Sequence, residues 1–123
     1  MKSQKVLKVS EHDEAVALAQ YLDILKTQGK IELFSHIPNE TFTRNWGTKM
    51  KNKQEGVRPG VPDYIVVTKD KIGFIELKRK GGVVSKDQRQ WFDSLGGKST
   101  GACIAYGFEP AKRFVEELLR KNI

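Results

Sequence analysis

The sequence contains one cysteine and no apolar run long enough to cross a membrane. A single cysteine excludes an intramolecular disulfide, and Cys103 lies in an apolar stretch that is typical of a small buried residue. The basic residues after Met1 are followed by no apolar signal core, so we do not expect export. These absences favour an intracellular, cytoplasmic protein that has no membrane partner.

Length bounds the number of domains. At 123 residues the chain can build one hydrophobic core and is too short for two. Hydrophobic residues make up 38% of the sequence and charged residues 30%, which is the balance of a globular domain. No repeat, linker or low-complexity tract divides the sequence, so we expect a single domain over residues 1–123.

Positive charge is concentrated in two segments. The formal net charge is +7, and residues 44–60 and 69–89 each carry a net +4, which leaves −1 for the rest of the chain. Such basic segments either form a solvated surface or bind phosphates with little regard for sequence. The cations that we expect to contact nucleic acid are Arg44, Lys49, Lys51, Lys53, Arg58, Arg79, Lys80 and Lys86.

Two predicted strands bring polar side chains together beside the basic segments. Residues 64–67 and 72–78 have the apolar content of paired strands, and alternation along the second strand places Glu76 and Lys78 on one face. A proline precedes Asp63, and proline is tolerated where a strand begins, so we expect Asp63 at the start of the first strand.

Two carboxylates and an ammonium group at one point of a sheet suit the hydrolysis of a phosphodiester bond. Mg²⁺ and Mn²⁺ prefer oxygen donors such as those of Asp63 and Glu76. Lys78 can then orient a water molecule on the ion or stabilise the charge that grows on the phosphate. The alternative is that the three residues form only a solvated surface.

The first predicted helix carries two candidate acids. It begins after Ser10, a good N-cap residue, and runs to about Thr27. At 100° per residue, Glu11 lies within about 40° of the apolar stripe that includes Leu18, and Glu14 lies about 60° from Glu11. Glu11 is therefore the better candidate to enter a site, unless it only complements the helix dipole.

Further elements complete an α/β pattern. We expect strands over residues 31–37 and 101–106, a helix from Ser85 to before Gly96, and a last helix from about Glu109. The strand over 31–37 should pair with the strand that Asp63 begins. The order is helix, three strands, helix, strand, helix, and residues 39–60 show no clean period.

Three more residues could serve either the fold or a site. Gln88 completes a capping box with Ser85, although its position also allows it to face the sheet. His36 could reach a phosphate, and Trp46 could stack on a base. Packing is the commoner role of a histidine in a strand and of a tryptophan.

Four motifs in order resemble those of the virus-type replication-repair nuclease (VRR-NUC) family, which belongs to the PD-(D/E)xK nucleases. They are HIPN at residues 36–39, GVRPGVPD at 56–63, IELK at 75–78 and SKDQ at 85–88, and SEHDE at 10–14 is similar to the first-helix segment of phage members. The resemblance covers about residues 10–120. It implies a restriction-endonuclease-like core, in which helices flank a central mixed sheet.

The resemblance also implies roles for the residues of the paired strands. Asp63 and Glu76 would bind Mg²⁺ or Mn²⁺, with the backbone carbonyl of Leu77 as a further ligand. Lys78 would match the catalytic lysine of the family. No organic cofactor is expected.

The helical positions match the family less completely. Glu11, or Glu14 in its place, would correspond to the metal-binding and catalytic glutamate of the first helix. Gln88 would correspond to the catalytic glutamine of the helix after the core strands. The chain departs from many phage relatives at Ala15, where they carry glutamine, so a polar contact near Glu11 is in doubt.

For activity, the chain resembles single-domain phage and bacterial members, which look like dimeric enzymes that cut four-way DNA junctions. The Fanconi-associated nuclease carries the domain on a larger chain and cuts flaps. The resemblance therefore implies a homodimeric Holliday-junction endonuclease in the cytoplasm of a bacterial or phage-infected cell. A flap or nicking nuclease and a non-catalytic DNA-binding module stay open.

Candidates for the dimer face are Val83-Val84 and Trp91-Phe92, although core filling is commoner for the aromatic pair.

Overall fold

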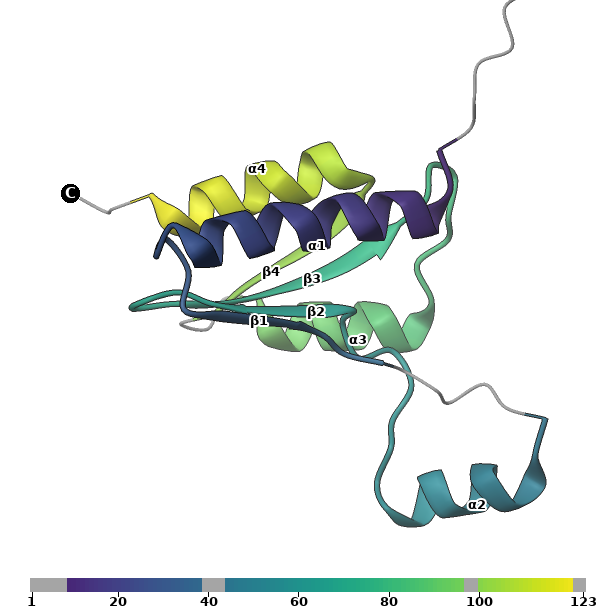
Figure 1. Cartoon of the computed structure of the whole chain (residues 1–123). Coiled ribbons are helices and arrows are strands. Elements are labelled where there is room, and N and C mark those ends of the chain that lie inside the picture. Colours follow the sequence, from purple (N-terminus) through teal and green to yellow (C-terminus); the bar gives the residue numbers. More distant parts are fainter. Residues whose placement is uncertain (1–8, 39–43, 97–99, 121–123) are drawn as a thin grey trace, which may run out of the picture.

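The computed structural model describes residues 9–38, 44–96 and 100–120, which form an α/β fold (Figure 1). The helices are α1 (Glu11–Thr27), α2 (Trp46–Gln54), α3 (Lys86–Leu95) and α4 (Phe108–Leu119), and the strands are β1 (Leu33–His36), β2 (Tyr64–Val67), β3 (Ile72–Lys78) and β4 (Gly101–Tyr106). The predicted class and the order of the predicted elements are confirmed. One helix that no sequence pattern predicted, α2, is inserted between β1 and β2.

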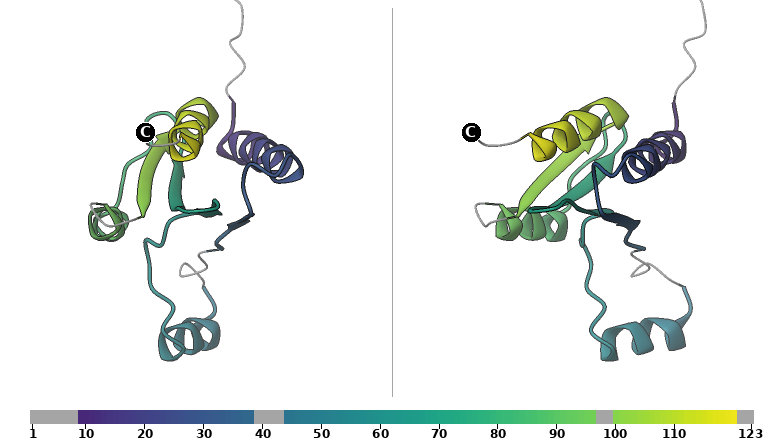
Figure 2. Two further views of the ribbon diagram at one scale, coloured as in Figure 1. Left: turned by 90° about the vertical axis from the view of Figure 1, so that its left-hand side faces the viewer. Right: turned by 60° about the vertical axis from the view of Figure 1, so that its left-hand side comes forward.

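The strands form one mixed sheet in the order β1-β2-β3-β4. The pairs β1–β2 and β2–β3 are antiparallel, whereas β4 runs parallel to β3 because α3 carries the chain back across the sheet between them. The predicted pairing of β1 with β2 is confirmed, with Phe34 opposite Val66. Helices α1 and α4 lie side by side over one face of the sheet, and α3 covers the other (Figure 2).

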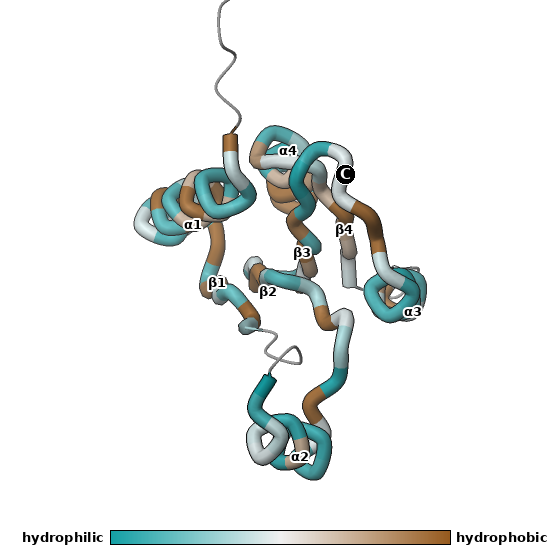
Figure 3. The backbone as a smooth tube through the Cα atoms, turned by 90° about the vertical axis from the view of Figure 1, so that its right-hand side faces the viewer, coloured by the Kyte–Doolittle hydropathy of each residue, from teal (hydrophilic) through white to brown (hydrophobic). Residues whose placement is uncertain are grey.

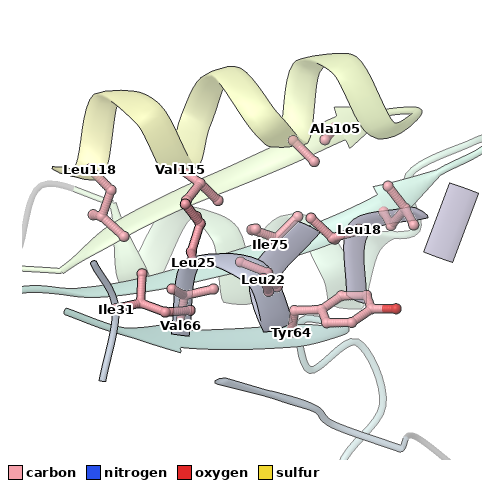
Figure 4. Close-up of a cluster of buried hydrophobic side chains, with 12 residues drawn as sticks. Leu18, Leu22, Leu25, Ile31, Tyr64, Val66, Ile75, Ala105, Val115 and Leu118 are labelled. Atoms are coloured by element: carbon pink, nitrogen blue, oxygen red, sulfur yellow. The ribbon is translucent and has the colours of Figure 1, made fainter. Parts of the chain in front are cut away.

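The hydrophobic core lies between the sheet and the layer of α1 and α4 (Figure 4). Leu18 and Leu22 of α1 and Val115 of α4 are fully buried. Alternation along β3 sends Ile75 into this core and leaves Glu76 on the opposite face. Burying a side chain of this size contributes about 1.5–3 kcal/mol. The core therefore fixes β3, and β3 fixes the position of Glu76.

Helix starts follow the predicted caps. Ser10 accepts a hydrogen bond from the Asp13 backbone N–H at 3.0 Å, and Ser85 accepts one from the Gln88 backbone N–H at 3.1 Å. Both serines form capping boxes.

Cys103 packs against the core, and burial raises the pKa of its thiol, as suits a structural cysteine. No helix in the described ranges is long and apolar enough to span a membrane.

Helix α2 stands apart from the three layers (Figure 1). Asn45 caps it by accepting a hydrogen bond from the Thr48 backbone N–H at 3.0 Å, and Gly56, with φ of 88°, follows its C-terminal end. None of its residues is buried. A helix without a buried stripe has no apolar period, which is why hydrophobic patterning alone predicts no element over residues 39–60.

Candidate active site

The loop before β2 is held on the first turn of α3. Gly60 has φ of 86°, and a Cβ atom built there would lie 2.5 Å from the backbone carbonyl carbon of Asp87, so only glycine fits. Trp91 of α3 donates a hydrogen bond from Nε1 to the Pro59 carbonyl at 3.1 Å. These contacts fix the loop that ends at Asp63.

The two candidate carboxylates lie opposite each other at the end of the β2–β3 ladder. Tyr64 pairs with Ile75 in the antiparallel register. That register places Asp63 across from Glu76. The Leu77 backbone N–H donates a hydrogen bond to Asp63 Oδ2 at 2.8 Å. The structure thus brings together the two acids that the strand pattern predicted to converge.

Gln88 joins this pair through a hydrogen bond that its own helix cap orients. Its side-chain oxygen accepts from the Ser85 backbone N–H at 2.9 Å, as the capping box requires. The amide nitrogen therefore points away from the cap, and it donates to Glu76 Oε1 at 2.7 Å. Gln88 fills both roles that the sequence allowed, because it caps α3 and also faces the sheet.

Glu76 is a buried acid with one unsatisfied oxygen. The residue is 6% exposed, and with both acids ionised its Oε2 has no hydrogen-bond donor among the described residues. Burial, the neighbouring Asp63 carboxylate and, when one acid is protonated, a hydrogen bond between the two carboxyl groups raise the pKa of Glu76 to about 8. Burial also raises the pKa of Asp63, and the hydrogen bond from the Leu77 N–H opposes that shift. Ionising both acids in this site requires a compensating cation.

Lys78 supplies positive charge near both acids. It shares the face of Glu76 on β3, and its ammonium group lowers the pKa of Glu76 and of Asp63, in opposition to burial. Its backbone carbonyl accepts a hydrogen bond from the Gly107 N–H at 2.9 Å, which ties the end of β3 to the start of α4. The charge of His36 also lowers the pKa of Asp63, and its ring packs on the tyrosine that follows Asp63, with 5.1 Å between centroids.

The two glutamates of the first helix have different surroundings. Glu14 Oε2 accepts a hydrogen bond from the Phe108 backbone N–H, next to Gly107, which has no side chain to cap α4. Glu14 therefore caps α4 from another helix. Glu11 is exposed in the first turn. Sequence patterns missed this cap, and the one signal for it is a glycine where the last helix would need an N-cap side chain.

The oxygen donors of Asp63 and Glu76 fit Mg²⁺ or Mn²⁺, and the unpaired Glu76 Oε2 is the observation that favours a cation there. In the described part of the chain, no cluster of three or more Asp, Glu, His or Cys side chains is arranged to hold a metal, so the pair is not joined by Glu11 or Glu14. The assignments of Glu11, or of Glu14 as its alternative, and of the Leu77 carbonyl as ligands therefore stay predictions.

The eight cations predicted to contact DNA are all exposed. Arg44 precedes α2, Lys49, Lys51 and Lys53 lie on α2, Arg58 lies in the loop before β2, Arg79 and Lys80 follow β3, and Lys86 opens α3. Lys51 lies 4.0 Å from Glu55, an exposed pair that contributes little to stability. Exposure leaves all eight able to reach phosphates, and their binding to DNA stays a prediction.

Comparisons with known proteins relate this geometry to one family. Residues 3–109 match the VRR-NUC domain. A solved structure described as a VRR_NUC domain protein superposes with a TM-score of 0.69 over 91% of this chain and 89% of that chain. Its sequence identity is 18%, so the likeness is one of fold. No curated protein sequence matches the chain.

Proposed function

Because this chain belongs to the VRR-NUC family and so is a nuclease of the PD-(D/E)xK type, we propose that it is a Mg²⁺- or Mn²⁺-dependent endonuclease that cuts branched DNA. The first expected substrate is a four-way junction, cut by a homodimer. The observation that carries the proposal is the buried pair of Asp63 and Glu76, with an unpaired Glu76 oxygen and the charge of Lys78 beside it.

Asp63 and Glu76 are the side chains that would hold the cation. Such an ion, when bound, activates water and neutralises charge on the scissile phosphate. Both carboxylates are positioned by hydrogen bonds within the protein. Gln88 Nε2 donates to one oxygen of Glu76, and the Leu77 N–H donates to one oxygen of Asp63. The conformations of both acids are therefore set by hydrogen bonds from β3 and α3.

Lys78 acts on the reactants and not on the ion. Its ammonium group can donate hydrogen bonds to the attacking water, which orients it, or to the phosphate, where negative charge grows as the bond breaks. The hydrogen bond from the Gly107 N–H holds the Lys78 backbone. Glu14 of α1 accepts a hydrogen bond from the backbone N–H of Phe108, the residue after Gly107. Helix α1 therefore helps to position the Lys78 backbone through the start of α4.

Resolution of a junction requires two cuts, and a two-fold dimer with one carboxylate pair in each subunit is the simplest arrangement that makes them. The basic segments on either side of the pair would bind the phosphates of the junction arms. For the dimer face we favour Val83, which is 84% exposed. Trp91 and Phe92 are partly buried, and Trp91 already holds the loop before β2.

The test is a panel of end-labelled four-way junction, 5′ flap, 3′ flap, nicked duplex, single strand and plain duplex. Each is incubated with Mg²⁺, with Mn²⁺ or with a chelator, and light scattering gives the mass of the free protein. The proposal expects a dimer that cuts the junction fastest, in both strands, and only with a divalent ion. If a monomer cuts a flap or a nick preferentially, the substrate is that structure and not the four-way junction. If the protein binds DNA but makes no metal-dependent cut, it is a DNA-binding module and not a nuclease.

A further inference from the structure

Helix α2 exposes side chains that a folded chain normally covers. Trp46 is 72% exposed and Met50 is 37% exposed, and α2 packs extensively on no other described helix or strand. Figure 3 shows α2 as a largely hydrophilic tube away from α1 and α4. Nine residues are too few for a helix to be stable on its own in water. The exposed face of α2 therefore suits a partner that covers it.

A hollow lies along this face of α2. It has a volume of about 270 Å³, and Trp46, Met50 and Val57 give it an apolar lining. Lys49 and Lys53 add positive charge to the same lining. An exposed aromatic ring and two ammonium groups on one hollow combine a stacking surface with phosphate-binding charge.

Two further hollows adjoin the first along the loop before β2. One, of about 250 Å³, shares Val57 with the first and adds Arg58 and Trp91. The other, of about 330 Å³, shares Arg58 and Trp91 and reaches Asp87 in the first turn of α3. The three hollows thus run from α2 along residues 57–59 of the loop that leads to Asp63.

We propose that this path binds an unpaired stretch of the DNA substrate, with a base stacked on Trp46 and phosphates on Lys49 and Lys53. The inference rests on the proposed function, because it takes DNA as the substrate. The net charge of +4 over residues 44–60 favours a polyanion over an apolar protein segment. In a continuous duplex the faces of the bases are covered by their neighbours, so an aromatic side chain can stack only where bases are unpaired. The path therefore adds affinity for DNA with unstacked bases, at the branch point of a junction or in a gap, over continuous duplex.

The test compares the affinity for a duplex with a short single-stranded gap and for a continuous duplex of the same length, in chelator so that nothing is cut. Trp46→Ala should weaken binding of the gapped duplex roughly 5- to 150-fold and change binding of the continuous duplex little. Trp46→Phe should keep most of the affinity, because a phenyl ring still stacks. Ile24→Ala, a control at a 56% exposed apolar residue of α1, should change neither. Thermal melts confirm that each variant is folded.

A second measurement reports on the stacking itself. Trp46 and Trp91 are the two tryptophans, so the difference in indole emission between the parent and Trp46→Phe reports on Trp46 with Trp91 kept in place. Gapped DNA should quench the parent more than Trp46→Phe, and continuous duplex should quench the two alike.

Equal binding of gapped DNA by the parent and by Trp46→Ala overturns the inference, and metal-dependent cleavage by the same parent protein leaves the proposed function standing. A parent protein that neither binds nor cuts DNA overturns both. If Trp46→Ala loses the dimer but keeps its DNA affinity, the exposed face of α2 binds a second copy of the chain and not DNA.

Discussion

Two regions of the molecule reverse the usual distribution of side chains in opposite ways. At the end of the sheet an acid, Glu76, is 6% exposed, whereas on α2 an aromatic residue, Trp46, is 72% exposed. Burying a carboxylate costs free energy unless a cation or hydrogen bonds compensate it. Exposing a large aromatic ring forgoes the free energy of burial.

The two regions differ in what holds them. Glu76 is fixed by the core beneath β3 and by the amide of Gln88, so the active site has its shape before any ligand arrives. Helix α2 is held by its own caps and buries none of its residues. On the functions proposed above, catalysis falls to the region that the core and its hydrogen bonds hold, and substrate selection falls to the exposed helix.

Removal of either carboxylate should have the largest effect. Asp63→Asn and Glu76→Gln are expected to lower cleavage roughly a thousand-fold or more, because the cation contributes several kcal/mol to the transition state. Both variants should stay folded, since a neutral amide of the same shape relieves buried charge. A labelled-junction gel and a thermal melt measure the two properties, with Asp23→Asn on the exposed side of α1 as the matched control. Parent-like cleavage by either variant contradicts the assignment.

Lys78→Ala should lower turnover roughly a hundred-fold or more, with little change in the affinity for Mn²⁺, because the lysine acts on water or phosphate. Lys78→Arg should restore only part of the activity, since the guanidinium group is broader than an ammonium ion. Single-turnover cleavage and a Mn²⁺ titration separate the two effects. Lys30→Ala, at an exposed lysine after α1, is the control. If Lys78→Ala cuts at the parent rate, the lysine is only a surface charge.

The double variant Lys51→Glu and Lys53→Glu sharpens the contrast between charge and stacking on α2. It should weaken all DNA substrates alike and flatten the plot of log affinity against log salt by about 0.9 for each phosphate that the protein no longer neutralises. Trp46→Ala should instead weaken only DNA with unpaired bases. Fluorescence anisotropy at several salt concentrations distinguishes the two, with Lys30→Glu as the charge control. An unchanged slope would show that Lys51 and Lys53 are solvated and neutralise no phosphate.

The stability of the metal-free protein should fall as the pH rises from about 5 to about 8. The pKa of Glu76 is raised from 4.5 to about 8 in the folded chain, so the folded state binds this proton more tightly than the unfolded state does. Between those values the unfolded chain is the more deprotonated, and stability decreases with pH. Glu76→Gln should flatten the decrease, and Mg²⁺ should raise Tm more at pH 8 than at pH 5 because the ion and the proton compete. Equal pH dependence in the parent and Glu76→Gln would be the contrary result.

The smallest expected effect separates the two glutamates of the first helix. Glu14→Ala should destabilise the fold by about 0.5–2 kcal/mol, because α4 loses its cap. Glu11→Ala should leave Tm unchanged and, if Glu11 is the metal ligand, should lower cleavage. Melting curves and cleavage rates are compared for both variants. A loss of cleavage without a loss of Tm in Glu14→Ala would make Glu14 the ligand and not a cap.

The sequence by itself determined the local features of the molecule. Alternation along residues 72–78 predicted that Glu76 faces away from the core, unlike the residues on either side of it. The serines before α1 and α3 predicted where these helices begin. The closeness of Asp63 and Glu76 also followed from the sequence, because a short turn joins β2 to β3 and sets their register. Each of these features depends on residues within a few positions or within one hairpin.

Only the tertiary structure decided where the helical side chains are used. Glu14 caps a helix that begins 94 residues later in the chain, and Gln88 turns its amide towards a strand residue. Helix α2 was missed because it buries nothing, and an apolar period arises only where a helix packs on a core. Hydrophobic periodicity records which face of an element is buried, whereas hydrogen bonds between distant elements and the surfaces left for a partner depend on how the layers pack together.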